Sequence, residues 1–298
     1  MSTATIRTSL RRTPRGATTS RPRSVALTTL FMAICAFYFL LPMWWLIVAS
    51  SRTTGQLATN HSLIPSSIGQ LFSNVADVLT YDGGIFVRWL LNSIGYAVIG
   101  AAGATVIAAM AGYGLAKYVF PGREAVFNTI LAGVLVPVTA LAMPLFLMFS
   151  QAHAVNTYWS VLIPSLVSPF GVYLSRIYAS AAVPGSLLEA ARLDGSGEVR
   201  TFFTMSARLM SPALVTIFLF SFVGIWNNFF LPLVMLQNQK LYPITLGLFS
   251  WNTQISRAPF LQTYVIVGSL LSAIPLLIAF LLLQRFWQSG LAEGAVKE

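Results

Sequence analysis

The amino-acid sequence predicts an all-α, polytopic membrane protein with six transmembrane helices. Of its 298 residues, 56% are hydrophobic and only 9% are charged, against about 25% charged residues in a typical globular chain. Six stretches hold about 20 mostly apolar residues, the length that a helix needs to cross the hydrocarbon of a bilayer. A soluble protein with a single buried core is excluded, because its surface would need many more charged side chains.

We expect the six spans near residues 25–50, 90–116, 126–150, 159–178, 212–236 and 262–284. The fourth contains Pro164 and Pro169, so the count becomes five if these residues break the helix. Proline is tolerated in a membrane span where neighbouring helices satisfy the freed carbonyl groups. Residues 25–284 thus form one transmembrane domain between a tail of residues 1–24 and a tail of residues 285–298.

The positions of Lys and Arg predict that both termini lie in the cytoplasm. With the N-terminus inside, the inner segments hold 14 of the 18 basic residues and the outer segments hold 4, in agreement with the positive-inside rule. The net charge of +10 is spread over these flanks and gives no basic face for nucleic acid. The arginine-rich tail before Val25 is either a solvated anchor that fixes this orientation or an organelle transit peptide.

Small residues repeat every four positions in the second span, at Gly100, Ala104, Ala108, Gly112 and Ala116. This spacing places them on one face of a helix, where they allow another helix to approach closely. We expect the face to contact protein, either another helix of this chain or a partner subunit.

The sequence lacks the motifs of nucleotide and metal sites. There is no phosphate-binding loop, and His61 and His153 lie in separate outer loops. We therefore expect no catalytic residues, no metal and no cofactor in this chain. The spans hold almost no ionisable side chain away from their ends, which disfavours ion channels and proton-coupled carriers and favours a neutral cargo.

The most polar feature at membrane depth is Trp226-Asn227-Asn228, near the middle of the predicted fifth span. The two amides need hydrogen-bond partners, and the indole adds a flat apolar face and one N–H donor, a combination that suits sugars. The three residues are candidates for the substrate path. Hydrogen bonding between helices is the alternative.

The longest inner loop, residues 179–211, predicts two short helices separated by a glycine turn. Ser186 and Glu189 have the spacing of a capping box, and Gly195 would help to end the first helix. Leucine and alanine side chains give this helix a small apolar face, which must dock on something because so short a helix is not stable alone. Glu189 either caps its own helix or contacts a cytoplasmic partner.

Within this loop, the string EAARLDGSG at residues 189–197 resembles the EAA loop of the inner-membrane permeases of binding-protein-dependent ABC importers. Gly195 lies four residues after the last Ala of EAA, and Pro212 follows downstream, as in that family. The chain departs from the family at residues 205–208, which read MSAR where the family often has an Ile-x-Leu-Pro run. The resemblance extends over residues 25–298.

Further strings are similar to the carbohydrate branch of the family, the MalG-like subunits. In chain order these are LLNSIGYAV (90–98), YGLAKYVFPGRE (113–124), NTYWSVLIP (156–164), PFGVYLSRIY (169–178), WNNFFLPL (226–233) and QRFWQSGLAEGAVKE (284–298). The resemblance implies a permease that lies in the inner (plasma) membrane, imports a sugar and is not itself an enzyme.

The resemblance also implies the partners. A second, related permease would complete the translocation path, a cytoplasmic ATPase dimer would bind and hydrolyse ATP, and an extracellular or periplasmic binding protein would deliver the sugar. The coupling contact with the ATPase would involve Glu189, Ala190, Ala191, Asp194 and Gly195. The outer loop, residues 237–261, would face the binding protein through Asn238, Tyr242, Trp251 and Asn252.

Two other classes of protein stay open as alternatives. A membrane-embedded glycosyl or acyl transferase would need an ionisable pair at one membrane face, and the only acidic cluster, Glu189, Asp194 and Glu198, lies in the EAA loop itself. A self-contained secondary carrier would need inverted repeats or charges inside the membrane.

Overall fold

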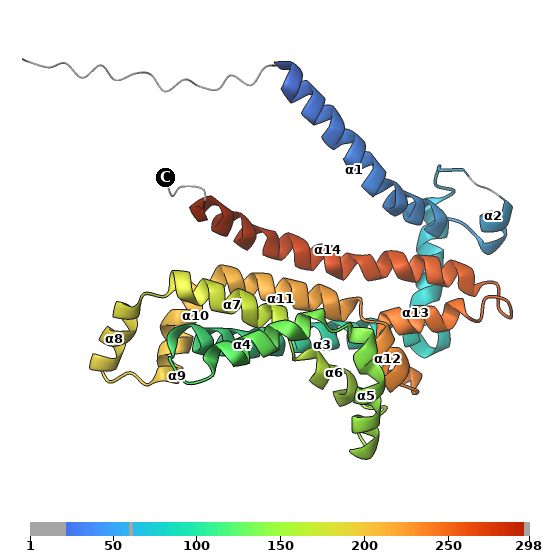
Figure 1. The fold of residues 1–298 in the computed structure, drawn as a ribbon. Helices are drawn as coiled ribbons and strands as arrows, with labels where there is room; N and C mark the ends of the chain where they lie inside the picture. Colours follow the sequence, from blue (N-terminus) through green and yellow to red (C-terminus); the bar gives the residue numbers. More distant parts are fainter. Residues whose placement is uncertain (1–21, 60–61, 295–298) are drawn as a thin grey trace, which may run out of the picture. The chain divides into compact units, whose positions relative to one another are not determined.

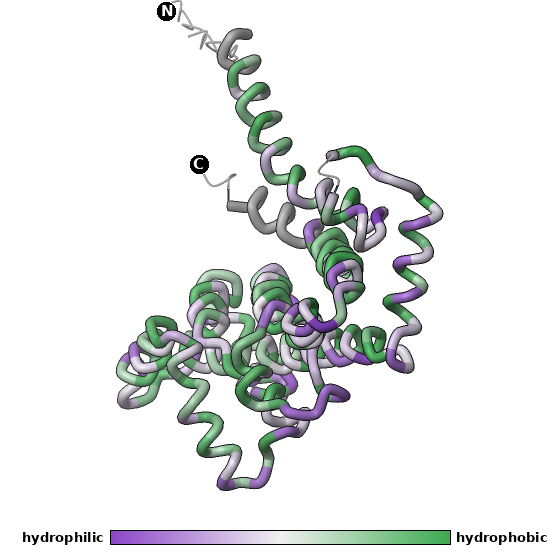
Figure 2. The backbone as a smooth tube through the Cα atoms, turned by 90° about the vertical axis from the view of Figure 1, so that its right-hand side faces the viewer, coloured by the Kyte–Doolittle hydropathy of each residue, from purple (hydrophilic) through white to green (hydrophobic). Residues whose placement is uncertain are grey.

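The computed structural model describes residues 22–59 and 62–294, and all regular elements within these ranges are helices (Figure 1). His61, residues 1–21 of the predicted N-terminal tail and residues 295–298 of the predicted C-terminal tail lie outside the described residues. Within these ranges, four helical segments are long and apolar enough to cross a membrane, namely Ala26–Ser50, Ile68–Lys117, Trp159–Ala182, which includes a short interruption, and Leu261–Gln284. The number rises to six if each of two bent pairs forms one span, namely Arg123–Leu135 with Val138–Gln151 and Glu198–Leu209 with Ser211–Trp226. Six is also the predicted number of spans, but the second bent pair begins at Glu198, inside the predicted inner loop, and ends at Trp226, so its bounds differ from those of the predicted fifth span. Hydrophobic residues run along most of the helices, and many hydrophilic residues lie at the turns between them (Figure 2).

The chain divides into two compact units after Trp45. Helix α1, Pro22–Ser50, supplies the described part of the first unit, and its apolar run Ala26–Ser50 is one of the candidate spans. Pro42 lies inside α1 without ending it. The second unit, from Leu46 onward, contains the other helices and all contacts described below.

After the short helix α2, Thr54–Thr59, the chain forms the 50-residue helix α3, Ile68–Lys117. Four residues, from Tyr81 to Gly84, interrupt α3 with non-helical backbone angles. Gly83 and Gly84 have φ values of 65° and 79°, in the left-handed region that glycine adopts readily. The predicted second span lies in the part of α3 that follows this interruption.

The second part of α3 is the centre of the unit that begins at Leu46. It packs against α7 (Pro169–Ala182), α11 (Ser211–Trp226) and α14 (Leu261–Gly294). The small residues from Gly100 to Gly112 are buried on the face of α3 that meets α7 and α11. A Cβ atom on Gly112 would lie only 2.7 Å from the carbonyl oxygen of Val172 in α7. The stripe of small residues is therefore used for packing within the chain.

The predicted third span, residues 126–150, is not one helix. It consists of α4 (Arg123–Ala132), the 3₁₀ turn η1 (Gly133–Leu135) and α5 (Val138–Gln151). The two halves meet at an angle of 104°. Pro137 explains the break, because proline disfavours helical angles at the preceding residue, and Val136 is extended with φ −79° and ψ 120°.

The fourth and fifth predicted spans are also interrupted. The fourth consists of α6 (Trp159–Ser165) and α7, which begins at Pro169 after the N-cap Ser168. In the fifth, α11 ends at Trp226 and α12 (Phe230–Met235) follows after three residues. Continuation of the helix would require an N–H donor at Pro232, which proline lacks. The Thr245 hydroxyl donates instead to the Asn228 carbonyl at 2.9 Å.

The segment predicted as an outer loop, residues 237–261, is largely folded. It contains the 3₁₀ turn η3 (Gln239–Leu241) and the helix α13 (Ile244–Asn252). Trp251 is 4% exposed, and its ring centroid lies 4.8 Å from that of Trp89. The prediction that Trp251 contacts a partner protein is therefore wrong, because its indole belongs to the core.

Candidate functional site

The interruptions of the third, fourth and fifth predicted spans meet at one cleft. The cleft has a volume of about 500 Å³ and includes Val136 and Val138 beside the first break, Val167 and Ser168 at the second, and Asn228 at the third. Clefts of this size commonly hold small organic ligands. Non-helical backbone at membrane depth is tolerated where it lines a cavity or is buried in protein. The position of the three breaks at the cleft fits this rule.

The cleft wall is mostly apolar and carries few polar side chains. Four polar residues line it, namely Ser165, Ser168, Ser221 and Asn228. The Ser165 hydroxyl donates to the carbonyl of Val161 at 2.7 Å, and the Ser168 hydroxyl accepts from the Gly171 amide at 3.2 Å. Both serines thus bond to the backbone of their own helix region. The cleft offers a neutral surface without a charged side chain.

The three residues predicted for the substrate path lie in different environments. Trp226 is 2% exposed and stacks on Phe222, with ring centroids 5.8 Å apart, so it belongs to the core. Asn227 is exposed, and its amide donates to the Val223 carbonyl at 2.9 Å. Only Asn228 lines the cleft. All three residues lie at the end of α11 and directly after it, where the helix breaks before α12 begins.

Sequence reasoning missed Ser221 as a cleft residue. Ser221, Gly224, Ile225 and Asn228 all line the cleft, and their spacing of three and four positions is that of one helix face. This periodicity, counted backward from Asn228, could have identified Ser221.

The loop between α7 and α11 forms short helices at the end of the unit opposite to α12 and α13 (Figure 1). They are α8 (Gly185–Leu193), α9 (Glu198–Thr201), the π-helix η2 (Phe202–Ser206) and α10 (Ala207–Leu209). Because α8 begins at Gly185, Ser186 lies inside the helix, and no side chain caps its start. The predicted capping box is therefore wrong.

The end of α8 has the geometry of a Schellman motif. Gly195 has φ 75°, and its amide donates to the Arg192 carbonyl at 3.0 Å. The Ser196 amide donates to the Ala191 carbonyl at 2.9 Å. This pair of bonds satisfies carbonyl groups that the last turn of a helix otherwise leaves free, and the left-handed position strongly favours glycine.

The apolar face of α8 docks on its own chain. Leu188 and Ala191 are 5% and 4% exposed, and Leu188 packs in a cluster with Tyr113 of α3 and Phe202 of η2. Ala191 is therefore buried within this chain, unlike the other four residues predicted for the coupling contact, which are exposed. The exposed residues of α8 and its end include Glu189, Ala190, Leu193 and Asp194.

Glu198 connects this loop to α3. Its Oε1 accepts from the Arg192 Nε at 2.7 Å, and its Oε2 accepts from the Tyr118 hydroxyl at 2.6 Å. The Arg192 guanidinium holds the pKa of Glu198 below its ordinary value. Burial, reinforced by the bond to Glu198, raises the pKa of Tyr118. At neutral pH the carboxylate is therefore charged and the phenol remains a donor.

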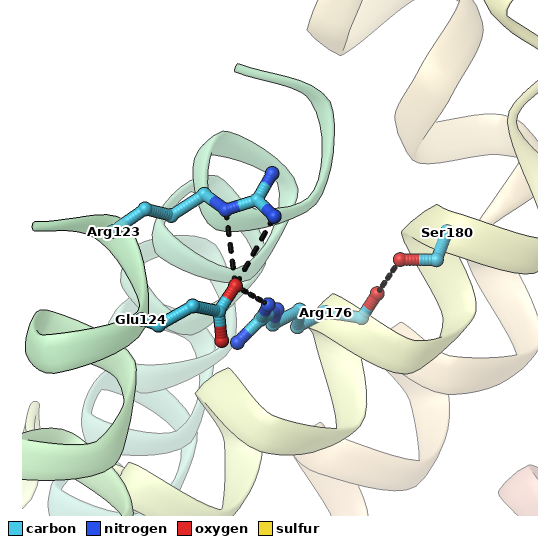
Figure 3. Close-up of polar contacts among 4 residues, drawn as sticks. All are labelled: Arg123, Glu124, Arg176 and Ser180. Carbon is cyan, nitrogen blue, oxygen red and sulfur yellow. Dashed lines mark hydrogen bonds and ion pairs between the residues drawn. The ribbon is translucent and has the colours of Figure 1, made fainter. Parts of the chain in front are cut away.

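A second polar cluster joins α4 to α7 (Figure 3). Glu124 Oε1 lies 2.5 Å from Arg176 Nη2 and 3.1 Å from Arg123 Nη2. The Arg176 guanidinium carbon also lies 4.0 Å from the centroid of the Phe127 ring. Arg176 thus fixes the two helices to each other through an ion pair and a cation–π contact.

Among residues 22–59 and 62–294, no three His, Cys, Asp or Glu side chains are grouped so that they could hold a metal ion. The acidic cluster that a transferase would need does not converge on one pocket, because Glu198 lines a pocket of about 180 Å³ that includes neither Glu189 nor Asp194. Glu198 is bound to Arg192 and Tyr118, while Glu189 and Asp194 are exposed on α8 and at its end.

A polytopic helical unit with broken helices around a cleft has the architecture of a membrane transport component. Residues 104–291 match the family described as "Binding-protein-dependent transport system inner membrane component". The chain belongs to this family of multi-pass membrane proteins.

Two relatives are similar over most of both chains. The arabinooligosaccharides transport system permease protein AraQ of Bacillus subtilis strain 168 is 32% identical over 278 residues, which cover 92% of this chain and 95% of AraQ. The lactose transport system permease protein LacG of Rhizobium radiobacter is 31% identical over 266 residues, which cover 89% and 94%.

The fold is similar to a chain in the crystal structure of a bacterial ABC transporter involved in the import of the acidic polysaccharide alginate. The TM-score is 0.78 at 23% sequence identity, and the match covers 92% of this chain and all of the other. This similarity supports the fold.

Proposed function

We propose that this chain is a transmembrane permease subunit of an ATP-driven, binding-protein-dependent sugar importer. The observation that carries the proposal is the EAARLDGSG segment, which forms an exposed helix ended by a glycine turn in a chain of this family. The names of its relatives support a sugar as cargo, since they refer to arabinooligosaccharides, lactose, and melibiose, raffinose and stachyose.

The cleft forms this subunit's half of the translocation path. Its neutral wall, with three serines and Asn228, suits a cargo that is uncharged and rich in hydroxyl groups. A second, homologous permease covers the open side of the cleft. Because the cleft carries no charged side chain, the free energy for transport against a gradient comes from the partner ATPase.

Helix α8 couples the chain to that ATPase. Its exposed residues Glu189, Ala190, Leu193 and Asp194 form the contact, and Gly195 shapes the turn that follows. ATP is bound and hydrolysed by the ATPase dimer, so this chain needs no cofactor of its own. In this arrangement α8 and both termini are cytoplasmic, and α13 with the exposed Asn238 and Asn252 faces the binding protein. The opposite positions of α8 and α13 in Figure 1 support this orientation.

The test is ATP hydrolysis and sugar uptake by the complete importer in lipid vesicles. Uptake of arabinooligosaccharides, lactose, raffinose and trehalose would be compared with and without the binding protein. Glu189→Ala and Leu193→Asp should reduce hydrolysis stimulated by the loaded binding protein. Asp77→Ala, which removes an exposed carboxylate from the first part of α3, should leave it unchanged.

Retained stimulation in both α8 variants would overturn the coupling assignment. Uptake without ATP, or without an ATPase in the purified assembly, would overturn the importer as a whole.

A further inference from the structure

We propose that Glu198 is the positioning residue that makes the coupling helix α8 and the second part of α3 move as one body. The inference rests on the proposed function, because it assigns the route by which a movement of α8 reaches the cleft. A family relationship alone names the coupling helix but gives no side chain that connects it to the rest of this chain.

The geometry of a single carboxylate carries the proposal. Glu198 begins α9, Arg192 lies in the last turn of α8, and Tyr118 follows directly after α3. The two carboxylate oxygens bind the other two groups at 2.7 and 2.6 Å. Three separate segments therefore meet at one side chain, and each of its oxygens has a different partner. Charge-assisted bonds of this kind are stronger and shorter than bonds between neutral groups.

Two further contacts hold α8 to the same parts of the chain. The Lys117 ammonium group at the end of α3 donates to the Val183 carbonyl at 2.6 Å, just before α8 begins. On the buried face of α8, Leu188 packs in a cluster that includes Tyr113 and Phe202, whose ring centroids are 5.1 Å apart. Both ends and the inner face of α8 are thus tied to α3 or to the segment that follows α9.

The attachment point on α3 explains how the movement could reach the cleft. The second part of α3 packs against α7, α11 and α6. These helices begin or end at two of the three breaks that line the cleft. A rigid shift of α3 would therefore move the helices of the cleft wall directly, without an intermediate loop. Packed helices transmit small shifts as whole elements.

An exposed ion pair by itself contributes little to stability, so the test must separate transmission from folding. In the complete importer, Cys35→Ser removes the single cysteine of the sequence, and Ser221→Cys then places a reporter in the cleft. The measurement is the rate at which a positively charged methanethiosulfonate reagent modifies this cysteine, with and without the ATP analogue AMP-PNP. AMP-PNP should change that rate in the assembly with native Glu198.

Glu198→Ala should reduce the nucleotide-dependent change at least about fivefold, the lower end of the usual coupling between two sites, while ATP binding and assembly are retained. Glu198→Gln keeps an acceptor for Tyr118 but loses the charge opposite Arg192, so its effect should be intermediate. Tyr118→Phe preserves the aromatic ring and removes one bond. Glu124→Gln is the matched control, because Glu124 bridges two arginines outside the loop, and it should respond like the native residue.

An assembled Glu198→Ala variant with an unchanged nucleotide response would overturn the role of Glu198. If the alanine variant does not assemble, an unchanged response in both Glu198→Gln and Tyr118→Phe would overturn it. A native assembly without any nucleotide response would instead overturn the proposed function.

Discussion

The cleft and the loop between α7 and α11, which we propose as the coupling loop, are held together by different bonds. In the cleft, three helices are broken, and the hydroxyls of Ser165 and Ser168 bond within their own helix regions. In the coupling loop, Glu198 bonds to side chains from two other segments. The cleft walls can therefore shift without losing these serine bonds, whereas α8 cannot leave α3 without breaking the polar contacts of Glu198. If the proposed function holds, we expect the cleft to rearrange and the coupling loop to transmit movement as a rigid body.

A substitution on the small-residue face of α3, which lies between the two regions, should have the largest effect. Gly112→Ala should destabilise the fold by about 1–3 kcal/mol, as overpacking does, because the new Cβ would lie 2.7 Å from backbone atoms of both Val172 and Arg176. Both regions should then lose function together. Thermal unfolding of the purified assembly measures the loss. Gly114→Ala, where no atom lies within 4 Å of the new Cβ, should leave the unfolding temperature unchanged or slightly higher.

A substitution at the end of α8 should affect the coupling loop alone. Gly195→Ala forces a Cβ into the left-handed region at φ 75°, at a cost of about 1–2 kcal/mol, which corresponds to roughly a 5–30-fold shift in a two-state equilibrium. We expect hydrolysis stimulated by the binding protein to fall, while the apparent affinity for sugar is retained. Gly197→Ala is the matched control, because Gly197 has φ −69° and open space around its Cβ. Equal losses in both variants would contradict the role of the turn.

A substitution in the cleft should have a smaller effect, and it should change the apparent affinity for sugar instead of the coupling to the ATPase. Asn228→Leu removes the one amide that lines the cleft, and a single lost hydrogen bond is worth about 0.5–1.5 kcal/mol. The sugar concentration for half-maximal uptake should rise several-fold, with nucleotide-driven closure intact. Asn227→Leu should have little effect, since the Asn227 amide bonds to its own helix. A larger effect at Asn227 than at Asn228 would move the path away from the cleft.

Changes of pH should have the smallest effect. The lowered pKa of Glu198 means that its contribution is present above the unfolded value of about 4.3 and is lost only as the pH falls through the still lower folded value. The raised pKa of Tyr118 keeps its contribution below the unfolded value of about 10. The ratio of the modification rates of the Ser221→Cys reporter with and without AMP-PNP should therefore be constant between about pH 5 and pH 9, because the titration of the reporter thiol itself changes both rates and cancels in the ratio. A midpoint inside this range would show that another titrating group controls coupling.

The sequence allowed prediction of features that depend on local chemistry. The spacing of small residues identified the packing face from Gly100 to Gly112, and Gly195 marked the end of α8, because both signals arise from a single helix. Apolar length also identified the long helices that contain the predicted first, second and sixth spans. The family resemblance was confirmed by the match over residues 104–291.

Features that depend on distant contacts could not be predicted. Hydrophobic length alone does not show whether a proline is tolerated, so the breaks at Pro137 and after Trp226 were missed. Trp226 and Trp251 carry polar indole groups that suit a ligand, yet both rings are buried in one core cluster that also contains Phe86 and Trp89 of α3. Ala191 belongs to the EAA string but is buried, because the packing of α8 against the following segment determines which side of α8 is free.

The most direct test of the account is site-specific photocrosslinking from α8 to the ATPase in the assembled importer. A photoreactive amino acid would replace Leu193, which is 89% exposed, or Leu188, which is 5% exposed. We predict crosslinks to the ATPase from position 193 and crosslinks within the chain from position 188. Crosslinks to the ATPase from neither position, in an assembly that still hydrolyses ATP in response to the binding protein, would contradict α8 as the coupling helix.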